Sequence, residues 1–360
     1  MVAGLALVAS LAPAVVHAAA GDLDPSFGGD GRVTTAFGGF GEVHGVAIDS
    51  QGRIVAAGRD STGFALARYK ANGALDPSFS SNGKVRTAFG DVAEAHSVAI
   101  DDQGRIVAAG LVRSRDPSGR DFALARYLPN GSLDDSFSSD GKVTTGFGGT
   151  EGITSVAIDS QGRIVAVGQR GRRSRYFPVA RYLPNGSLDP SFSGDGKVLT
   201  GFGTQAYATS VAIDSQDRIV AAGTTGDGSD IGDFALARYN RDGSLDSSLS
   251  GDGRKRTDFG GQEVAQSVAI DSQGRILAAG YAAGFAPNGG GFDFAVARYN
   301  QNGGLDGSFG AGGKVTTDFG IDTIDRAMSV AIDSQHRIVA VGITQTNVRG
   351  QDFALARYIG

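Results

Sequence analysis

Two Glu-x-His pairs are the side chains of this sequence best suited to chemistry. Glu42 and His44 form one pair, and Glu94 and His96 form the other. Carboxylate and imidazole groups can together bind a divalent cation or act as an acid–base pair. They can equally be polar residues that solvate two loops, because the matching positions of other repeats differ. Those positions hold Thr154, Thr209, Gln266 and Met328. The residues thus leave open one divalent cation or no cofactor.

Arginines gather in two segments that vary between repeats. They are Arg113, Arg115, Arg120, Arg170, Arg172, Arg173 and Arg175. A later segment carries acids instead, at Asp227, Asp230 and Asp233. A basic sector in a chain of net charge −5 can attract an anionic polymer or an acidic patch of a protein. The alternative is solvated loops with local ion pairs, each worth about 0–1 kcal/mol.

Several aromatic residues also stand outside the repeated motifs. They are Phe40, Tyr176, Tyr207, Tyr281, Phe285 and Phe292. Such residues either pack locally to hold long loops or form a platform for a ligand. With the arginines, we take Tyr176, Tyr207, Tyr281 and Phe285 as candidate ligand-binding residues.

Six copies of one unit must position all these residues. Val-Ala-Ile-Asp begins at Val46, Val98, Val156, Val211, Val268 and Val330. Each copy continues with Arg-Ile-Val/Leu-Ala and a run such as Phe-Ala-Leu-Ala-Arg-Tyr (122–127), and a Gly-Lys-Val-Thr-Thr-type segment belongs to the same unit. These segments are short, rich in β-branched and aromatic residues, and bounded by Gly, Asn or Asp, as strands are. Four strands repeated at this period predict propeller blades.

The fold class expected is therefore all-β, a six-bladed β-propeller with four antiparallel strands per blade. The chain starts with a lone fourth strand, Val33 to Phe37, and ends with a third strand, Phe353 to Tyr358. We expect the N-terminal strand to complete the C-terminal blade, because this closes the ring and removes open edges. Residues 21–360 would then form a single domain.

Composition and the N-terminus indicate where the protein acts. Residues 1–20 read as a secretory signal, with an apolar run from Leu5 to Val16 and cleavage near Ala18–Ala20. The mature protein is then extracellular or periplasmic, with no membrane span. An acidic balance argues against nucleic acid as a partner. The chain has no cysteine, which excludes disulfides and thiolate chemistry. We expect a monomer.

The motifs resemble one known family. Ser-Val-Ala-Ile-Asp-Ser-Gln-Gly-Arg-Ile-Val-Ala (155–166), Phe-Ala-Leu-Ala-Arg-Tyr (122–127) and Asn-Gly-Ser-Leu-Asp-Pro-Ser-Phe (185–192) are similar to the bacterial delta-60 repeat. The similarity spans residues 22–358, and a looser likeness to NHL-type repeats lies in the strand order. The resemblance implies a β-propeller of a secreted or surface bacterial protein. It implies no activity and no site residues.

These observations favour a binding or scaffold protein over an enzyme. No Gly-x-Ser-x-Gly, His-Glu-x-x-His or phosphate-binding loop is present in the sequence. Varying loops on one face of a rigid scaffold are the expected place to bind a protein or an anionic polymer. The alternative is a metal-dependent propeller enzyme, hydrolase or lactonase-like, whose site at the channel mouth contains the two Glu-x-His pairs.

Overall fold

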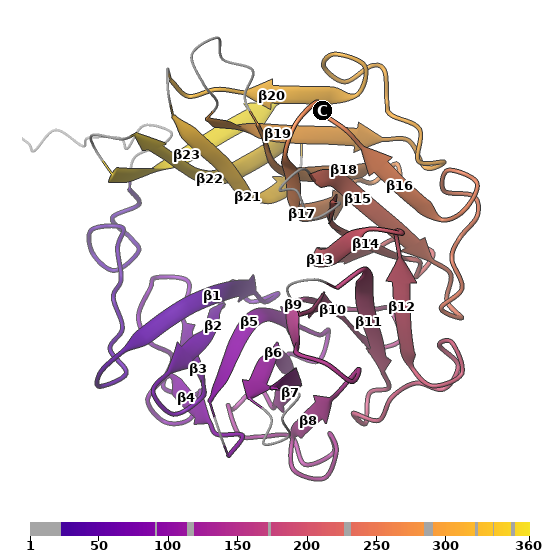
Figure 1. The fold of residues 1–360 in the computed structure, drawn as a ribbon. Helices are drawn as coiled ribbons and strands as arrows, with labels where there is room; N and C mark the ends of the chain where they lie inside the picture. Colours follow the sequence, from indigo (N-terminus) through magenta and orange to yellow (C-terminus); the bar gives the residue numbers. More distant parts are fainter. Residues whose placement is uncertain are drawn as a thin grey trace, which may run out of the picture.

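The computed structural model describes residues 23–90, 92–113, 119–171, 174–226, 232–283, 291–320, 323–333, 335–346 and 350–360. These residues form β-strands, turns and loops, without a helix in the described ranges. The strands make six sheets, of which five have four strands and the last has three. Figure 1 shows the sheets following one another in chain order around a common centre. The predicted six-bladed, all-β architecture is therefore confirmed.

Each blade takes its strands in chain order. Blade one contains β1 (Gly41–Ile48), β2 (Ile54–Asp60), β3 (Phe64–Tyr69) and β4 (Lys84–Thr87). Blade two contains β5 (Ala93–Ile100), β6 (Ile106–Arg113), β7 (Arg120–Tyr127) and β8 (Lys142–Thr145). Blade three contains β9 (Glu151–Ile158), β10 (Ile164–Arg170), β11 (Tyr176–Tyr182) and β12 (Lys197–Gly201). Blade four contains β13 (Gln205–Ile213), β14 (Ile219–Gly226), β15 (Gly232–Tyr239) and β16 (Arg254–Thr257). Blade five contains β17 (Glu263–Ile270), β18 (Ile276–Ala283), β19 (Phe292–Tyr299) and β20 (Lys314–Thr317). Blade six contains β21 (Ile324–Ile332), β22 (Ile338–Thr346) and β23 (Gly350–Tyr358).

The first strand of every blade contains a β-bulge. In blade three, Val167 pairs with Ser155 and Gly168 pairs with Ile153, so Thr154 has no partner across the ladder. The same one-residue shift recurs in the other five blades. A Cβ on Gly168 would lie 2.0 Å from the carbonyl oxygen of Gly152. The bulge therefore explains why each second strand carries glycine at this point: the opposite backbone comes too close for any side chain.

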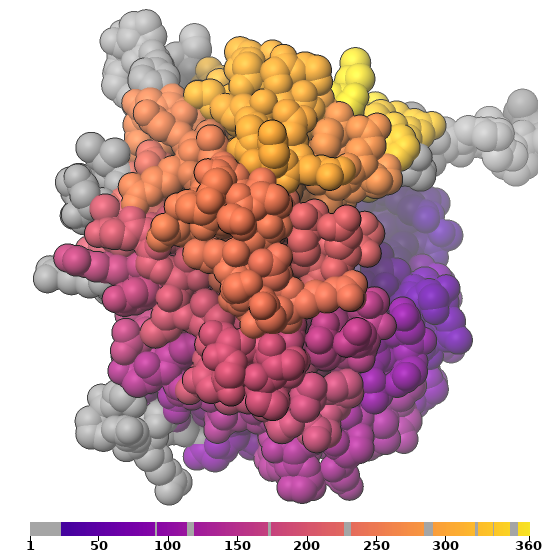
Figure 2. All heavy atoms as spheres, turned by 90° about the vertical axis from the view of Figure 1, so that its right-hand side faces the viewer, coloured from indigo at the N-terminus to yellow at the C-terminus, as the bar shows by residue number. Residues whose placement is uncertain are grey.

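The hydrophobic core lies between blades. One cluster joins Phe122 and Phe137 of blade two to Ile153 and Tyr182 of blade three, all fully buried. The hydroxyl of Tyr182 also donates to Thr145 Oγ1 of blade two at 2.9 Å. Because neighbouring repeats share their cores, each blade depends on the next for burial. Figure 2 shows the outcome on the surface, where the repeats pack side by side without a break from magenta to orange.

A buried ion pair anchors the connection after the third strand in blades one to five. In blade three, Arg181 Nε lies 2.8 Å from Asp189 Oδ2, and both side chains are buried. The guanidinium also stacks over Phe192, with Cζ 4.6 Å from the ring centroid, and donates to the carbonyl of Arg241 in the next blade. The arginine of Ala-Arg-Tyr thus pairs with a turn carboxylate. Its repeated role is to join blades, not to do chemistry.

The turn between the first two strands of each blade contains a residue with positive φ. The turn between the first two strands places glycine in the left-handed region, as at Gly52 with φ of 73°. Where glycine is replaced, Asp217 and His336 adopt φ of 57° and 63°. These side chains tolerate positive φ better than most. An ion pair spans this turn, with Arg53 Nε 2.6 Å from Asp49 Oδ2.

The ends of the ring differ from the prediction. Blade six has three strands, and residues 33–37 form no strand and do not pair with β23. They lie against blade one instead, where Tyr69 Oη donates to Thr35 Oγ1 at 2.7 Å and Lys84 Nζ donates to Ala36 O at 3.1 Å. Phe353 of β23 consequently remains 92% exposed. In Figure 1 the first blade (β1 to β4) and the last blade (β21 to β23) face each other at the left of the view.

Candidate functional site

The channel mouth is where residues that differ between blades converge. First strands of neighbouring blades contact one another, so they are the innermost strands. Each first strand has one bulge residue that lacks a partner in the ladder. In three blades its side chain bonds to the backbone of the next blade: His96 Nδ1 contacts Ile153 O at 2.9 Å, Thr154 Oγ1 donates to Ala208 O at 2.9 Å, and Thr209 Oγ1 to Ala265 O at 2.7 Å. His96 therefore takes the same joining role as two threonines.

The two Glu-x-His pairs meet, as the repeat spacing predicted, but around an arginine. Arg59 Nε lies 2.8 Å from Glu42 Oε2, and Arg59 Nη1 lies 2.6 Å from Glu94 Oε1. The rings of His44 and His96 contact edge to face, with centroids 5.5 Å apart. Burial lowers the pKa of His44, and His96 lowers it further against the opposing effect of the glutamates. A cation bound by these four residues would have to displace Arg59, which already forms an ion pair with both carboxylates.

Four of the predicted basic residues fall in the described part of the chain. Arg113 and Arg120 pair across the strands β6 and β7, and both are exposed. Arg175, just before β11, is exposed as well. None of these three forms an ion pair with a described carboxylate. Arg170 differs, since its Nε lies 3.3 Å from Glu151 Oε1 and its Nη2 donates to Gly148 O at 3.0 Å. The predicted candidates Arg115, Arg172, Arg173 and Phe285 lie outside the described residues.

A depression lies beside this basic sector, between blades two and three. Its volume is about 560 Å³, and its lining includes Leu111, Arg120, Thr150, Glu151 and Gln169. Arg120 contributes a positive charge to this lining, which also contains the carboxylate of Glu151. Tyr176, 39% exposed, follows Arg175 in blade three. We call Arg113, Arg120, Arg170, Arg175 and Tyr176 the basic sector.

Further aromatic candidates lie in blades four and five. Tyr207 of blade four is 36% exposed, and burial together with the neighbouring Tyr281 raises its pKa to about 12. Tyr281 packs edge to face on Phe292, with ring centroids 5.0 Å apart. The guanidinium carbon of Arg326, from blade six, lies 5.1 Å from the centroids of both Tyr281 and Phe292. These aromatic candidates thus pack partly on one another, as the local-packing alternative predicted, while Tyr207 keeps an exposed face.

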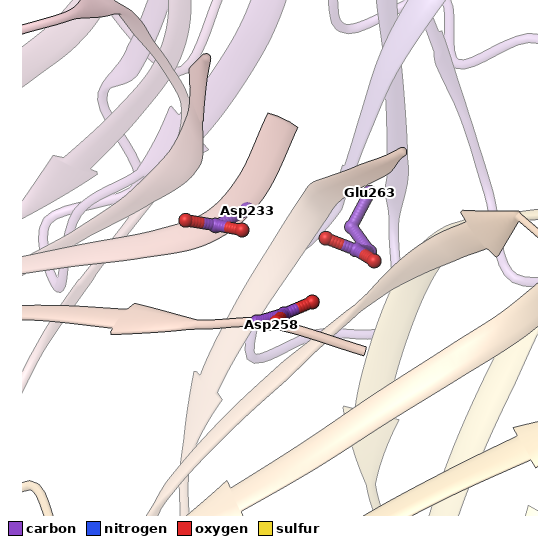
Figure 3. A group of neighbouring side chains, drawn as sticks. All are labelled: Asp233, Asp258 and Glu263. Atoms are coloured by element: carbon purple, nitrogen blue, oxygen red, sulfur yellow. The ribbon is translucent and has the colours of Figure 1, made fainter. Parts of the chain in front are cut away.

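A cluster of three acids spans blades four and five. Asp233 comes from β15, Asp258 follows β16, and Glu263 opens β17. One oxygen from each carboxylate lies within 4.8 Å of the others. Figure 3 shows the three carboxylates turned toward one another. Burial, with the nearby Asp258 and Asp233 charges, raises the pKa of Glu263 to about 7.

A second cluster repeats this arrangement one blade further on. Asp293 of β19, Asp318 after β20 and Asp325 of β21 again bring ligand oxygens within 4.8 Å of one another. Burial raises the pKa of Asp293, and the charges of Asp318 and Asp325 add to the effect. We call the two groups the acidic junctions.

The junction between blades two and three lacks the third acid and contains an arginine. Glu151 opens β9 at the position that Glu263 has in β17, and it is also buried. Gly146 stands where the two acidic junctions have an aspartate after the fourth strand. Arg170 supplies a cation to Glu151 instead. This junction has two acids, Glu151 and the nearby Asp121, with an arginine paired to Glu151. The three-acid junctions form no ion pair with any described side chain.

Of these six acids, the sequence pattern singled out Asp233 alone, and the acidic junctions were not predicted. The available signal was an aspartate before the repeated Phe of the third strand, another before the Phe of the fourth segment, and an acid opening the next blade. Only the packing of blades brings the third acid to the first two.

In the described part of the chain, no helix is long and apolar enough to cross a membrane.

Comparison with known families agrees with this fold. The family described as a β-propeller domain of unknown function, DUF5122, matches residues 50–79, 104–137, 160–192, 217–249 and 272–309. These segments run from the first turn to the connection after the third strand in blades one to five. The chain is therefore similar to a repeat family of β-propellers, as its motifs predicted. No curated protein matches the sequence.

Solved structures share the fold at low identity. A polysaccharide lyase of family PL25, an ulvan lyase bound to a saccharide, is 11% identical with a TM-score of 0.50, covering 86% of this chain and 79% of that one. A protein from Lactobacillus plantarum is 11% identical with a TM-score of 0.50, covering 88% and 84%. The extracellular domain of a one-component system from B. thetaiotaomicron is 14% identical with a TM-score of 0.37. It covers 88% of this chain, which spans only 38% of that longer domain. Such identities support the fold alone.

Proposed function

We propose that this chain is a secreted or surface propeller that binds an anionic polymer, or an acidic patch of a partner protein, through the loops of one face. The observation that carries the proposal is the basic sector. Arg113, Arg120 and Arg175 are exposed cations without an ion pair to any described carboxylate. Elsewhere in the repeats, arginines pair with acids of the chain itself, as Arg181 does with Asp189.

The contrast between the two faces supports this assignment. The face with the Asp-Ser-Gln-Gly-Arg turns uses its charges internally, as in the pair of Arg163 with Asp159 at 2.6 Å. The loops of the other face differ from blade to blade and present unpaired cations with Tyr176. A rigid scaffold with variable loops on one face is a common design for binding proteins. The resemblance to the delta-60 repeat adds the expectation of a secreted or surface location.

The test uses polymers of defined charge. Binding of the mature chain to polygalacturonate and to poly-L-glutamate would be measured by isothermal titration calorimetry, with dextran as the neutral polymer. The triple variant Arg113→Ala/Arg120→Ala/Arg175→Ala removes the unpaired cations. If each contributes about 0.5 kcal/mol, the variant binds about tenfold more weakly. Added salt should also weaken the wild-type complex, because exposed charges are screened.

A matched control removes three other positive charges. Arg32, Lys70 and Arg241 are exposed and lie away from the variable loops. Their triple alanine variant has the same net charge as the test variant and should keep most of the binding. Equal loss in both variants would show that only net charge matters. Absence of binding to both anionic polymers by the wild type would refute the proposal.

A further inference from the structure

We propose that each acidic junction binds one hard divalent cation, calcium or magnesium, which joins the two blades that supply its ligands. This inference is independent of the proposed function. The two sites are Asp233, Asp258 and Glu263 between blades four and five, and Asp293, Asp318 and Asp325 between blades five and six.

The spacing of the carboxylates fits a shared cation. Oxygens bound to one Ca²⁺ at about 2.3–2.6 Å can lie at most about 5 Å apart. In both junctions the three ligand oxygens lie within 4.8 Å of one another. Three carboxylates held this close repel each other strongly unless a positive charge lies between them. The cation supplies that charge.

Unpartnered buried oxygens point to the same conclusion. Glu263 is fully buried; its Oε1 accepts a hydrogen bond from Gly261 N at 2.6 Å, and its Oε2 has no partner. Asp325 is also fully buried; its Oδ2 accepts from Phe319 N and Thr323 Oγ1, both at 2.9 Å, and its Oδ1 has no partner. Buried carboxylate oxygens are costly to leave unpaired. A bound cation would satisfy them.

The first junction offers one more oxygen. Thr225 pairs with Asp233 across β14 and β15, so the two side chains share a face of the sheet. Its hydroxyl is buried and has no hydrogen-bond partner. Ala282 takes this place opposite Asp293 in the second junction. We therefore expect the junction of blades four and five to bind its cation more tightly.

No described side chain forms an ion pair with the carboxylates of the acidic junctions. Arg256, whose charge acts on Asp233, donates instead to Phe202 O and Thr204 Oγ1. At the junction of blades two and three, by contrast, Arg170 Nε lies 3.3 Å from Glu151 Oε1 and supplies a positive charge from the chain itself. All-oxygen ligands without histidine or cysteine favour calcium or magnesium over zinc.

The experiment is a metal titration of the full mature chain after treatment with chelator. Bound Ca²⁺ and Mg²⁺ would be counted by mass spectrometry and titrated by calorimetry, and thermal unfolding would be followed with and without each ion. We expect two ions per chain and a melting temperature that rises with the ion. Whichever ion gives the larger rise identifies the cation. No bound ion and no rise with either one would overturn the proposal.

Three single variants locate the sites. Asp258→Asn and Asp318→Asn change exposed ligands, so folding should be preserved, and each should reduce the count by one ion. Asp121→Asn, at the junction balanced by Arg170, should leave the count at two. In chelator, Asp258→Asn should melt higher than the wild type, because it removes one repelling charge. An unchanged ion count in both junction variants would overturn the assignment.

Discussion

The hydroxyl of Tyr69 donates to Thr35 Oγ1 at 2.7 Å. The equivalent tyrosine–threonine hydrogen bond joins consecutive blades in the rest of the ring. Tyr182 makes it with Thr145 at 2.9 Å, and Tyr239 makes it with Thr200 at 2.6 Å. In those pairs, the threonine belongs to the outer strand of the preceding blade. The N-terminal segment therefore lies beside blade one as the outer strand of blade six would, although β23 does not pair with it.

This contact gives a register in which the ring can close. Phe64 pairs with Thr87, and Ala65 with Arg86, in blade one. The matching pairs are Phe353 with Thr35 and Ala354 with Thr34. We expect the cysteine-free chain to form a disulfide when Thr34→Cys and Ala354→Cys are combined, because paired strands bring Cα atoms within bridging distance.

Mobility on a non-reducing gel after mild oxidation checks this register. The control combines Thr34→Cys with Leu355→Cys, which places the second cysteine on the other face of the strand. Cross-linking of both pairs alike, or of neither, would contradict the expected closure. Closure would also bury Phe353, whose counterpart Phe64 is fully buried.

Acid should unfold this protein through its buried ion pairs. Burial by itself raises the pKa of Asp189, but hydrogen bonds from Ser191 and the charge of Arg181 more than offset it, so the pKa lies below its ordinary value. The unfolded chain then binds the proton more readily than the folded one. The stabilisation is fully present above the ordinary carboxyl pKa and is lost as pH falls through the lowered value.

Removing one partner tests the same pair at neutral pH. Arg181→Met leaves the charge of Asp189 buried and uncompensated, which should cost about 3–5 kcal/mol in the free energy of unfolding. Urea denaturation at pH 7 measures this loss. The double variant Arg181→Met/Asp189→Leu removes both charges and should recover part of it. A loss below about 1 kcal/mol for the single variant would show that the pair matters little.

Gly168→Ala should be strongly destabilising. The new Cβ would lie 2.0 Å from the carbonyl oxygen of Gly152, which is backbone and cannot turn aside. We expect a loss of at least about 1–3 kcal/mol, since the strand or the bulge must shift. Gly307→Ala is the control, because no atom lies within 4 Å of its added Cβ. Thermal unfolding compares the two, and equal melting temperatures would argue against a steric role for the glycine.

The sequence by itself determined the blades. The repeated Val-Ala-Ile-Asp and Phe-Ala-Leu-Ala-Arg-Tyr runs predicted the strands, and turn residues such as Asp217 and His336 agree with the observed positive φ. These features depend on residues close together in the chain. Local burial, strand period and backbone sterics are enough to specify them.

Only the tertiary structure decided which side chains meet between blades. The Glu-x-His pairs converge as expected, but Arg59 from a second strand lies between their carboxylates. Asp233 and Glu263 belong to different repeats and meet because adjacent blades pack face to face. The pairing of the N-terminal segment was likewise decided by packing, since Tyr69 holds Thr35 against blade one while β23 stays unpaired. Such contacts depend on the angle and distance between sheets, which no local pattern in the sequence encodes.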